Sequence, residues 1–164
     1  MSDEKEQKMN TKYVGHHISS GGFIFHEDKD TGLLSVLLIK NKKGEYWIPK
    51  GHIEEGEDQI AAAFREIEEE VGLTKDQLTY IGLCHLDKFS FVDDGGNPNT
   101  KDVYMNLFGV HEKHDLKKEE GATDLTDAGW FEFSRALEMI IPYSKNELIK
   151  AKEMFENYLR SSSS

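Results

Sequence analysis

The sequence predicts an α+β fold in which a mixed β-sheet is covered on two sides by helices. Apolar and aromatic segments separated by turn residues occur on both sides of one Ala- and Glu-rich segment, 58–71, and a second helical segment, 145–160, lies near the end of the chain. Strands on both sides of a central helix favour a layered arrangement. The 164 residues suit one domain with its own core. We expect that domain over 13–160, with a disordered tail at 1–12 and a serine tail at 161–164.

Composition and charge exclude several classes of protein. Hydrophobic residues make up 37% and charged residues 31%, which is typical of a globular chain. The net charge of −11 repels phosphate backbones and anionic lipids, so we expect no duplex nucleic acid and no membrane as partners. A single cysteine, Cys84, excludes an internal disulfide and favours a reducing compartment, so we expect a cytoplasmic protein. The sequence leaves the oligomeric state open.

The first half of the sheet is predicted from short apolar runs. The segment beginning at Ile18 and the run 33–39 form a hairpin across the turn 28–32, because a continuous apolar run of this length is typical of a buried strand. A second turn at 41–45 precedes a short strand, 46–48, which Pro49 ends because proline donates no ladder hydrogen bond.

The remaining elements follow from helix and strand signals. The helix over 58–71 contains no Gly or Pro and ends at Gly72, a C-cap candidate. Strands at 78–92 and 102–110 form an antiparallel pair across a long loop, 93–100, and one more short strand is expected at 129–133. Ser134 is predicted to cap a brief helix through 140, and Ser144 a longer one over 145–160.

Most of the negative charge lies in one segment. Between Gly51 and Leu73 there are eight acids and one base, a net charge of −7. On a helical wheel the predicted sheet-facing side holds Ile60 and three apolar side chains within roughly 40° of it: Phe64, Ile67 and Val71. Three carboxylates share the opposite side: Glu66, Glu69 and Glu70. Their mutual repulsion opposes the helix by a few tenths of a kcal/mol per pair, and a hard divalent cation would offset it. The alternative is a solvated acidic face without a metal ion.

The segment as a whole carries a spaced motif. Its specified residues are Gly51, Glu57, Arg65-Glu66-Ile67, Glu69-Glu70 and Gly72-Leu73, which fill every position of G-x5-E-x7-R-E-U-x-E-E-x-G-U, where U is apolar. The sequence therefore resembles the Nudix hydrolase family. The motif covers about a seventh of the chain, and the run WIPKGH at its start is similar to the dinucleoside-polyphosphate-hydrolase and MutT-like branches. The order of elements agrees with the α/β/α sandwich of that family.

The resemblance implies a reaction and a set of roles. The reaction is hydrolysis of a nucleoside diphosphate linked to another group, with Mg²⁺ or in its place Mn²⁺. The implied metal ligands are Glu66, Glu69, Glu70 and the carbonyl of Gly51. Arg65 would hold a carboxylate, Glu57 or Glu66, in a bidentate grip, unless it forms a plain surface ion pair. The general base is Glu66, or else a distal loop acid: Glu119, Glu120 or Asp124. A Nudix-fold module that binds a nucleotide without cleaving it is the alternative function.

Substrate identity depends on residues outside the motif. Lys50 is a candidate phosphate contact, and Phe89, Phe91 and Tyr104 are candidate base platforms, although strand packing explains each aromatic residue as well. Where some diadenosine-polyphosphate members of the family have a tyrosine, this sequence has Ser90 and Phe91. Where ADP-ribose members have a proline, it has Phe89. The run WIPKGH favours dinucleoside polyphosphates such as diadenosine tetraphosphate, with nucleoside triphosphates and capped RNA ends also open.

Overall fold

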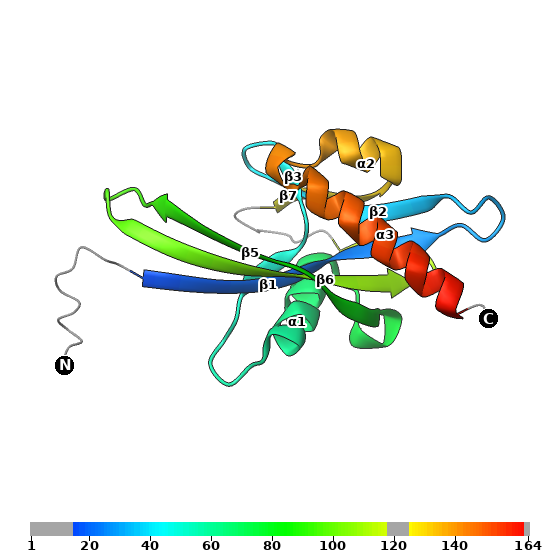
Figure 1. Cartoon of the computed structure of the whole chain (residues 1–164), viewed down its shortest axis with the longest axis horizontal. Helices are drawn as coiled ribbons and strands as arrows, with labels where there is room; N and C mark the ends of the chain where they lie inside the picture. The colour runs from blue at the N-terminus through cyan, green and yellow to red at the C-terminus, as the bar shows by residue number, and fades with distance from the viewer. Residues whose placement is uncertain (1–14, 118–124, 163–164) are drawn as a thin grey trace.

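The computed structural model describes residues 15–117 and 125–162. The predicted tail 1–12, and the last two residues of the predicted tail 161–164, lie outside these ranges. The elements are β1 (Gly15–Glu27), β2 (Leu34–Asn41), β3 (Tyr46–Trp47), β4 (Lys50–His52), α1 (Gln59–Val71), β5 (Thr79–Val92), β6 (Pro98–Val110), β7 (Leu125–Glu132), α2 (Phe133–Met139) and α3 (Lys145–Ser162), with 3₁₀ turns η1 (Lys75–Gln77) and η2 (Pro142–Ser144). Helix α1 lies on one side of the sheet, and α3 with α2 on the other (Figure 1). The predicted α+β architecture is confirmed.

The sheet is mixed because one central strand has both parallel and antiparallel neighbours. The strand order is β3-β2-β1-β6-β5, with β4 also paired to β1 and β7 to β2. Strand β1 runs parallel to β6 from Gly15 opposite Asn99 to His26 opposite Val110, and antiparallel to β2 and β4. One end of β1 extends with β5 and β6 beyond the helices as an arm (Figure 1).

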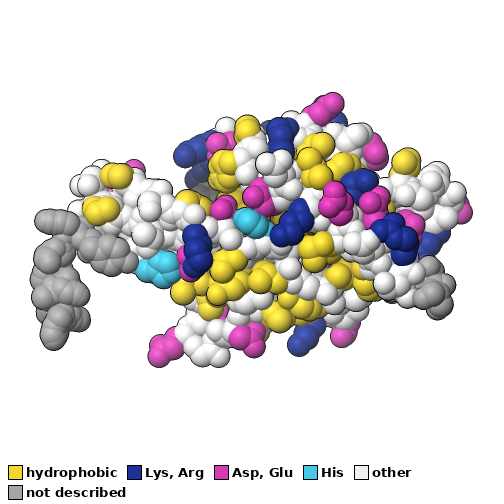
Figure 2. Space-filling model, in the orientation of Figure 1, with side chains coloured by type: hydrophobic (Ala, Val, Ile, Leu, Met, Phe, Trp, Pro, Cys, Tyr) yellow, Lys and Arg dark blue, Asp and Glu magenta, His cyan; other side chains and the backbone are white. Residues whose placement is uncertain are grey.

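The two faces of the sheet bury separate apolar clusters. Phe23 and Phe25 of β1 face the α3 side, and Ile24 between them faces the α1 side, as strand alternation requires. All three are fully buried. Charged side chains of both signs are spread over the outer surface drawn in Figure 2. None of the helices in the described ranges is long and apolar enough to cross a membrane.

Helix α1 begins and ends at capping residues. The Asp58 side chain accepts a hydrogen bond from the backbone N–H of Ala61 at 2.7 Å, and Gly72 closes the helix in the left-handed region at φ 83°. Gly72 was the predicted C-cap. The prediction that Ile60 faces the sheet is wrong, since its side chain is 37% exposed. The inner side of the first turn is instead polar, because Gln59 exchanges hydrogen bonds with the buried amide of Asn106.

Other differences from the prediction concern element ends. Strand β6 begins at Pro98, so the predicted loop 93–100 is mostly a tight turn, in which the Asp93 side chain accepts hydrogen bonds from the N–H groups of Gly95 and Asn97. Strand β4 was not predicted, and α3 continues two residues into the serine tail.

Neither predicted serine cap forms. The Ser134 hydroxyl donates to the Glu132 carboxylate, and Glu132 occupies the N-cap position of α2. Ser144 is fully buried, and its hydroxyl has no hydrogen-bond partner among the described residues. The short 3₁₀ turn that starts at Pro142 turns the chain into α3 instead.

The C-cap of α1, Gly72, gives a prediction about stability. A Cβ at Gly72 would lie 2.8 Å from the Cβ of Lys117, in addition to the strain of a positive φ. We expect Gly72→Ala to lower the free energy of unfolding by about 2 kcal/mol. Gly32→Ala is the matched control, because Gly32 has φ 76° with open space around it and should cost about 1 kcal/mol or less. Urea unfolding of both variants measures the difference, and equal losses would contradict the role of the Lys117 contact.

Candidate functional site

The motif folds so that α1 and β4 touch. Gly51 of β4 pairs with Ser20 of β1, and this pairing holds Gly51 against the side chain of Glu66 on α1. A Cβ at Gly51 would lie 2.1 Å from the Glu66 carboxyl carbon. Only glycine therefore leaves room for this carboxylate beside the strand.

Arg65 connects the motif's carboxylates. Its Nε and Nη2 atoms donate to the two oxygens of Glu57 at 2.6 and 3.0 Å, which is the bidentate geometry of a strong ion pair. Nη1 donates to Glu66 at 2.8 Å and to Glu69 at 3.2 Å, and Nη2 also donates to the carbonyl of His52 at 2.9 Å. One guanidinium thus ties the loop before the helix, strand β4 and two carboxylates of α1 together.

The same segment shifts carboxyl pKa values in opposite directions. Hydrogen bonds from Arg65, and then from the backbone N–H of Glu54, lower the pKa of Glu57 to about 2. Burial raises the pKa of Glu66, against the opposing effect of Arg65. The Glu66 side chain is only 12% exposed. Burial also raises the pKa of Glu70 to about 8, with a further contribution from the negative charge of Glu66.

Glu66 and Glu70 therefore form a pair of largely buried carboxyl groups. The positive charge and hydrogen bonds around them do not fully balance the negative charge that they carry when ionised. The Glu70 side chain accepts a hydrogen bond from the backbone N–H of Lys50 at 3.1 Å, and a cation between the two carboxyl groups would stabilise their charged forms. Their oxygens are the donors that hard divalent ions prefer, so this pair fits such an ion chemically. Glu69 is 58% exposed and bonded to Arg65. Within the described ranges no three acidic, histidine or cysteine side chains are close enough together to hold a metal ion. Glu69 would have to leave Arg65 to join the pair.

Basic groups line the other side of β4. Burial, and after it the charge of the neighbouring Lys101, lowers the pKa of Lys50 to about 8. The pKa of His52 is also lowered, by burial first and then by Lys101 and His17. The rings of His17 and His52 lie 5.9 Å apart, and that of Phe91 lies 5.7 Å from His17. Sequence reasoning did not identify His17 and Lys101, because no local spacing links them to the motif.

Two of the aromatic candidates, Phe89 and Tyr104, do not come together. Phe89 pairs with Lys101 across β5 and β6, and Tyr104 pairs with Leu86, so the two aromatic side chains point to opposite faces of the sheet. They cannot form two sides of one base site. The distal acids Glu119, Glu120 and Asp124 lie outside the described residues.

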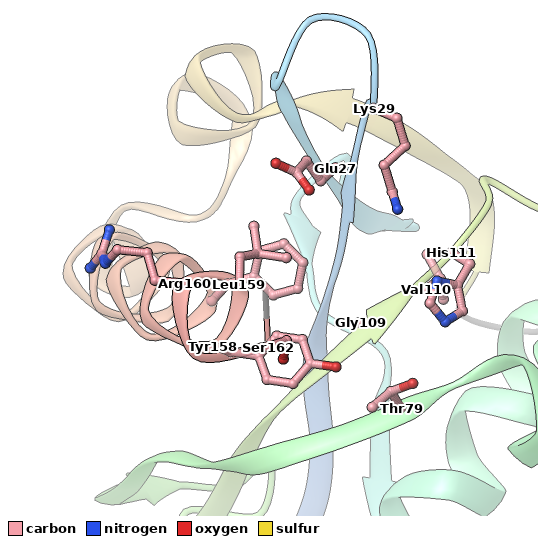
Figure 3. A pocket seen from close by; sticks show the side chains of 11 residues that line it. Glu27, Lys29, Thr79, Gly109, Val110, His111, Tyr158, Leu159, Arg160 and Ser162 are labelled. Atoms are coloured by element: carbon pink, nitrogen blue, oxygen red, sulfur yellow. The ribbon is translucent and has the colours of Figure 1, made fainter. Parts of the chain in front are cut away.

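A cavity of about 440 Å³ opens beside the carboxyl pair, and we call it the Trp47 cavity. Its lining includes Glu70 and Lys50 and also residues of the turn between β2 and β3. A second cavity, of about 480 Å³, lies at the C-terminal end of α3, where Tyr158 and Leu159 face Thr79 and Gly109 of the sheet (Figure 3). No residue of the motif lines the second cavity, whereas Glu70 and its neighbour in the site, Lys50, line the Trp47 cavity.

The Arg65–Glu57 pair predicts a pH-dependent stability. Because the pKa of Glu57 falls from 4.5 to about 2 on folding, the stabilisation is fully present above pH 4.5 and is lost as the pH falls through 2. We expect Glu57→Gln to be less stable than the wild type near neutral pH. The difference in the free energy of unfolding between the two proteins should disappear as the pH falls from 4.5 to 2. Urea unfolding at a series of pH values measures it. Glu55→Gln, at an exposed position of the same loop, should show no such closing gap, and a gap for Glu57→Gln that stays constant with pH would contradict the pairing.

Comparisons with known proteins agree with this geometry. A protein-family model described as NUDIX domain matches residues 15–151. An asymmetrical bis(5'-nucleosyl)-tetraphosphatase of Caenorhabditis elegans is 34% identical over 90 residues, which are 54% of this chain and 63% of that protein. An RNA pyrophosphohydrolase of Ruthia magnifica is 26% identical over 143 residues, or 79% of this chain and 78% of that one. Nudix hydrolase 10 of Arabidopsis thaliana is 24% identical, and the match spans 44% of its length. The matches thus span less than two thirds of the worm and plant proteins.

Solved structures show the same fold. The crystal structure of a C. elegans Ap4A hydrolase binary complex superposes with a TM-score of 0.64 at 23% identity, covering 88% of this chain and 98% of that one. A NUDIX hydrolase structure from Listeria monocytogenes gives a TM-score of 0.69 at 14% identity, covering 86% and 95%. Because the family model spans most of the chain and the motif is complete, this protein belongs to the Nudix family.

Proposed function

We propose that this protein is a divalent-metal-dependent hydrolase of a phosphoanhydride bond in a nucleoside diphosphate linked to another group. The observation that carries the proposal is the contact of Gly51 with Glu66, next to Glu70, which gathers the motif's buried oxygens at one place. The names of the relatives support the substrate class, since one is a bis(5'-nucleosyl)-tetraphosphatase and another an RNA pyrophosphohydrolase. Diadenosine tetraphosphate and nucleoside triphosphates are the substrates that we expect, in a cytoplasmic protein.

The metal ion would be held by the carboxylates of Glu66, Glu69 and Glu70 and the carbonyl oxygen of Gly51. Nudix hydrolases generally use divalent ions, and we propose Mg²⁺, with Mn²⁺ as a substitute. When bound, the ion supplies charge neutralisation for the phosphates and a water of lowered pKa. The motif's own charge of −7 requires this, because an anionic substrate would otherwise be repelled.

Each remaining residue has a role that follows from its contacts. Arg65 and Glu57 position the helix and the loop, since they bond to each other and Arg65 also donates to the backbone carbonyl of His52. Lys50 faces the carboxyl pair and would bind a phosphate oxygen of the substrate. Glu66 is the proposed general base, because burial raises its pKa toward the range in which a carboxylate accepts a proton efficiently.

A substrate panel tests the reaction. The purified protein is assayed with diadenosine tetraphosphate, nucleoside triphosphates, ADP-ribose and triphosphate-ended RNA, each with Mg²⁺, with Mn²⁺ and with EDTA. Metal-dependent release of a nucleotide, identified by chromatography, is the expected result. Nucleotide binding without turnover on any member would favour the alternative of a nucleotide-sensing module.

The ligand assignment gives a mutational prediction. We expect Glu69→Gln and Glu70→Gln each to lower kcat by about a hundredfold or more, because each removes a charged oxygen ligand. Glu68→Gln is the matched control, since Glu68 is exposed on the same helix and lies at an unspecified position of the motif. It should retain activity within about threefold. Thermal unfolding checks that the fold is intact, and near-normal activity of the Glu69 and Glu70 variants would refute the assignment.

A further inference from the structure

The Trp47 cavity continues the candidate site away from the metal-binding pair. Glu70 and Lys50 line it, and both belong to the site already described. A ligand bound at Glu70 would therefore lie at the wall of this cavity. Its volume of about 440 Å³ lies within the range of small-molecule sites, which is roughly 300 to 1,000 Å³.

The wall of the cavity is apolar and partly aromatic. It includes Ile39 of β2, Trp47 of β3 and Ile48, of which the two isoleucines are buried. The Trp47 ring is held in place, because the Lys50 ammonium group lies 4.7 Å from its centre and the ring of Tyr143 meets it edge-on at 5.7 Å. A fixed aromatic ring beside aliphatic side chains is a surface suited to a nucleobase or a ribose.

The rim of the cavity is basic. Lys42 and Lys43 lie side by side in the turn between β2 and β3, and both line the cavity. Asn41 holds this turn in shape, since its side-chain oxygen accepts from the backbone N–H groups of Lys43 and Glu45 at 2.9 and 3.0 Å. The Asn41 amide donates in turn to the Glu45 carboxylate at 3.1 Å, so the acid on this rim is already bonded.

We propose that the Trp47 cavity binds one nucleotide unit of the substrate, with the nucleoside against Trp47 and its phosphates between Lys50 and the pair Lys42–Lys43. The inference rests on the proposed function, which supplies the class of ligand. An apolar wall with two lysines at the rim selects a molecule that is aromatic in one part and anionic in another. Because Lys42, Lys43 and Glu70 all line this cavity, the substrate is a nucleoside polyphosphate whose phosphate chain reaches both the two lysines and the metal ion proposed at Glu70.

The test is an NMR titration with ATP in EDTA, which removes divalent metal and with it hydrolysis. The chain has two tryptophans, Trp47 and Trp130, so its indole N–H region holds two signals, and Trp47→Phe assigns them. We expect ATP to shift the Trp47 signal. The Trp130 signal should stay unchanged, because Trp130 lies on β7 and does not line the cavity. Inorganic tripolyphosphate, which has no nucleoside, should shift the Trp47 signal less.

The double variant Lys42→Ala/Lys43→Ala should raise the Kd for ATP about tenfold, and added salt should reduce this difference. Lys113→Ala/Lys150→Ala removes the same charge at exposed positions outside the cavity and should leave the Kd within about twofold. Equal Kd values for the wild type and the Lys42/Lys43 variant, or an unmoved Trp47 signal, would overturn the proposal.

The two proposals fail separately. Lysine-dependent ATP binding, with no hydrolysis of any member of the substrate panel in Mg²⁺ or Mn²⁺, supports the cavity assignment and refutes the hydrolase function. Hydrolysis by the wild type with a Kd that ignores Lys42 and Lys43 supports the hydrolase function and refutes the cavity assignment.

Discussion

The structure of the candidate site depends on the close approach of helix α1 to strand β4. Gly51 makes this approach possible, because any side chain there would overlap the Glu66 carboxylate. The approach in turn places the His52 carbonyl within 2.9 Å of Arg65 and the Lys50 N–H within 3.1 Å of the Glu70 carboxylate. Backbone groups of a three-residue strand thus hold side chains of a helix, which is a more rigid support than contacts between flexible side chains would be. The backbone of β4 thus fixes the side of α1 that carries Glu66 and Glu70.

This arrangement has an electrostatic cost that the segment offsets only in part. Arg65 compensates Glu57 fully, as the low pKa of that carboxyl group shows, but its remaining donors are divided between Glu66 and Glu69. Glu70 receives a backbone hydrogen bond from Lys50 and the effect of that lysine's charge, but burial and the charge of Glu66 still raise its pKa to about 8. Burying carboxyl groups without a full counter-charge destabilises the fold. The carboxyl groups without a full counter-charge, Glu66 and Glu70, are also ones that we propose as metal ligands. On that proposal, the same buried negative charge destabilises the fold and would bind a cation.

The sequence predicted the local features of the site well and its long-range features poorly. Helix α1 and its Gly72 cap could be predicted because capping and helical spacing act within a few residues. The parallel pairing of β1 with β6 could not, since it joins Gly15 to Asn99 and no local pattern encodes it. For the same reason Lys101 was not expected beside Lys50. Ile60 was misplaced because the periodic pattern counts apolar residues, whereas a polar pair, Gln59 with Asn106, holds the first turn of the helix to the sheet. The roles of the motif residues stay predictions.

The placement of the cavity explains why acidic and basic groups can both serve one anionic ligand. Glu70 of α1 lines the Trp47 cavity together with Lys42 and Lys43. Lys50 lines it too, near enough to Glu70 for their charges to affect each other. A polyphosphate in this cavity would meet lysines directly and carboxylates only through a metal ion, because carboxylates repel bare phosphate. The reacting phosphates would therefore need a metal ion, whereas binding of the rest of the ligand would depend on the lysines and on Trp47. Mutations could then change affinity and turnover separately. This would not be possible if the same groups both bound the ligand and took part in the reaction.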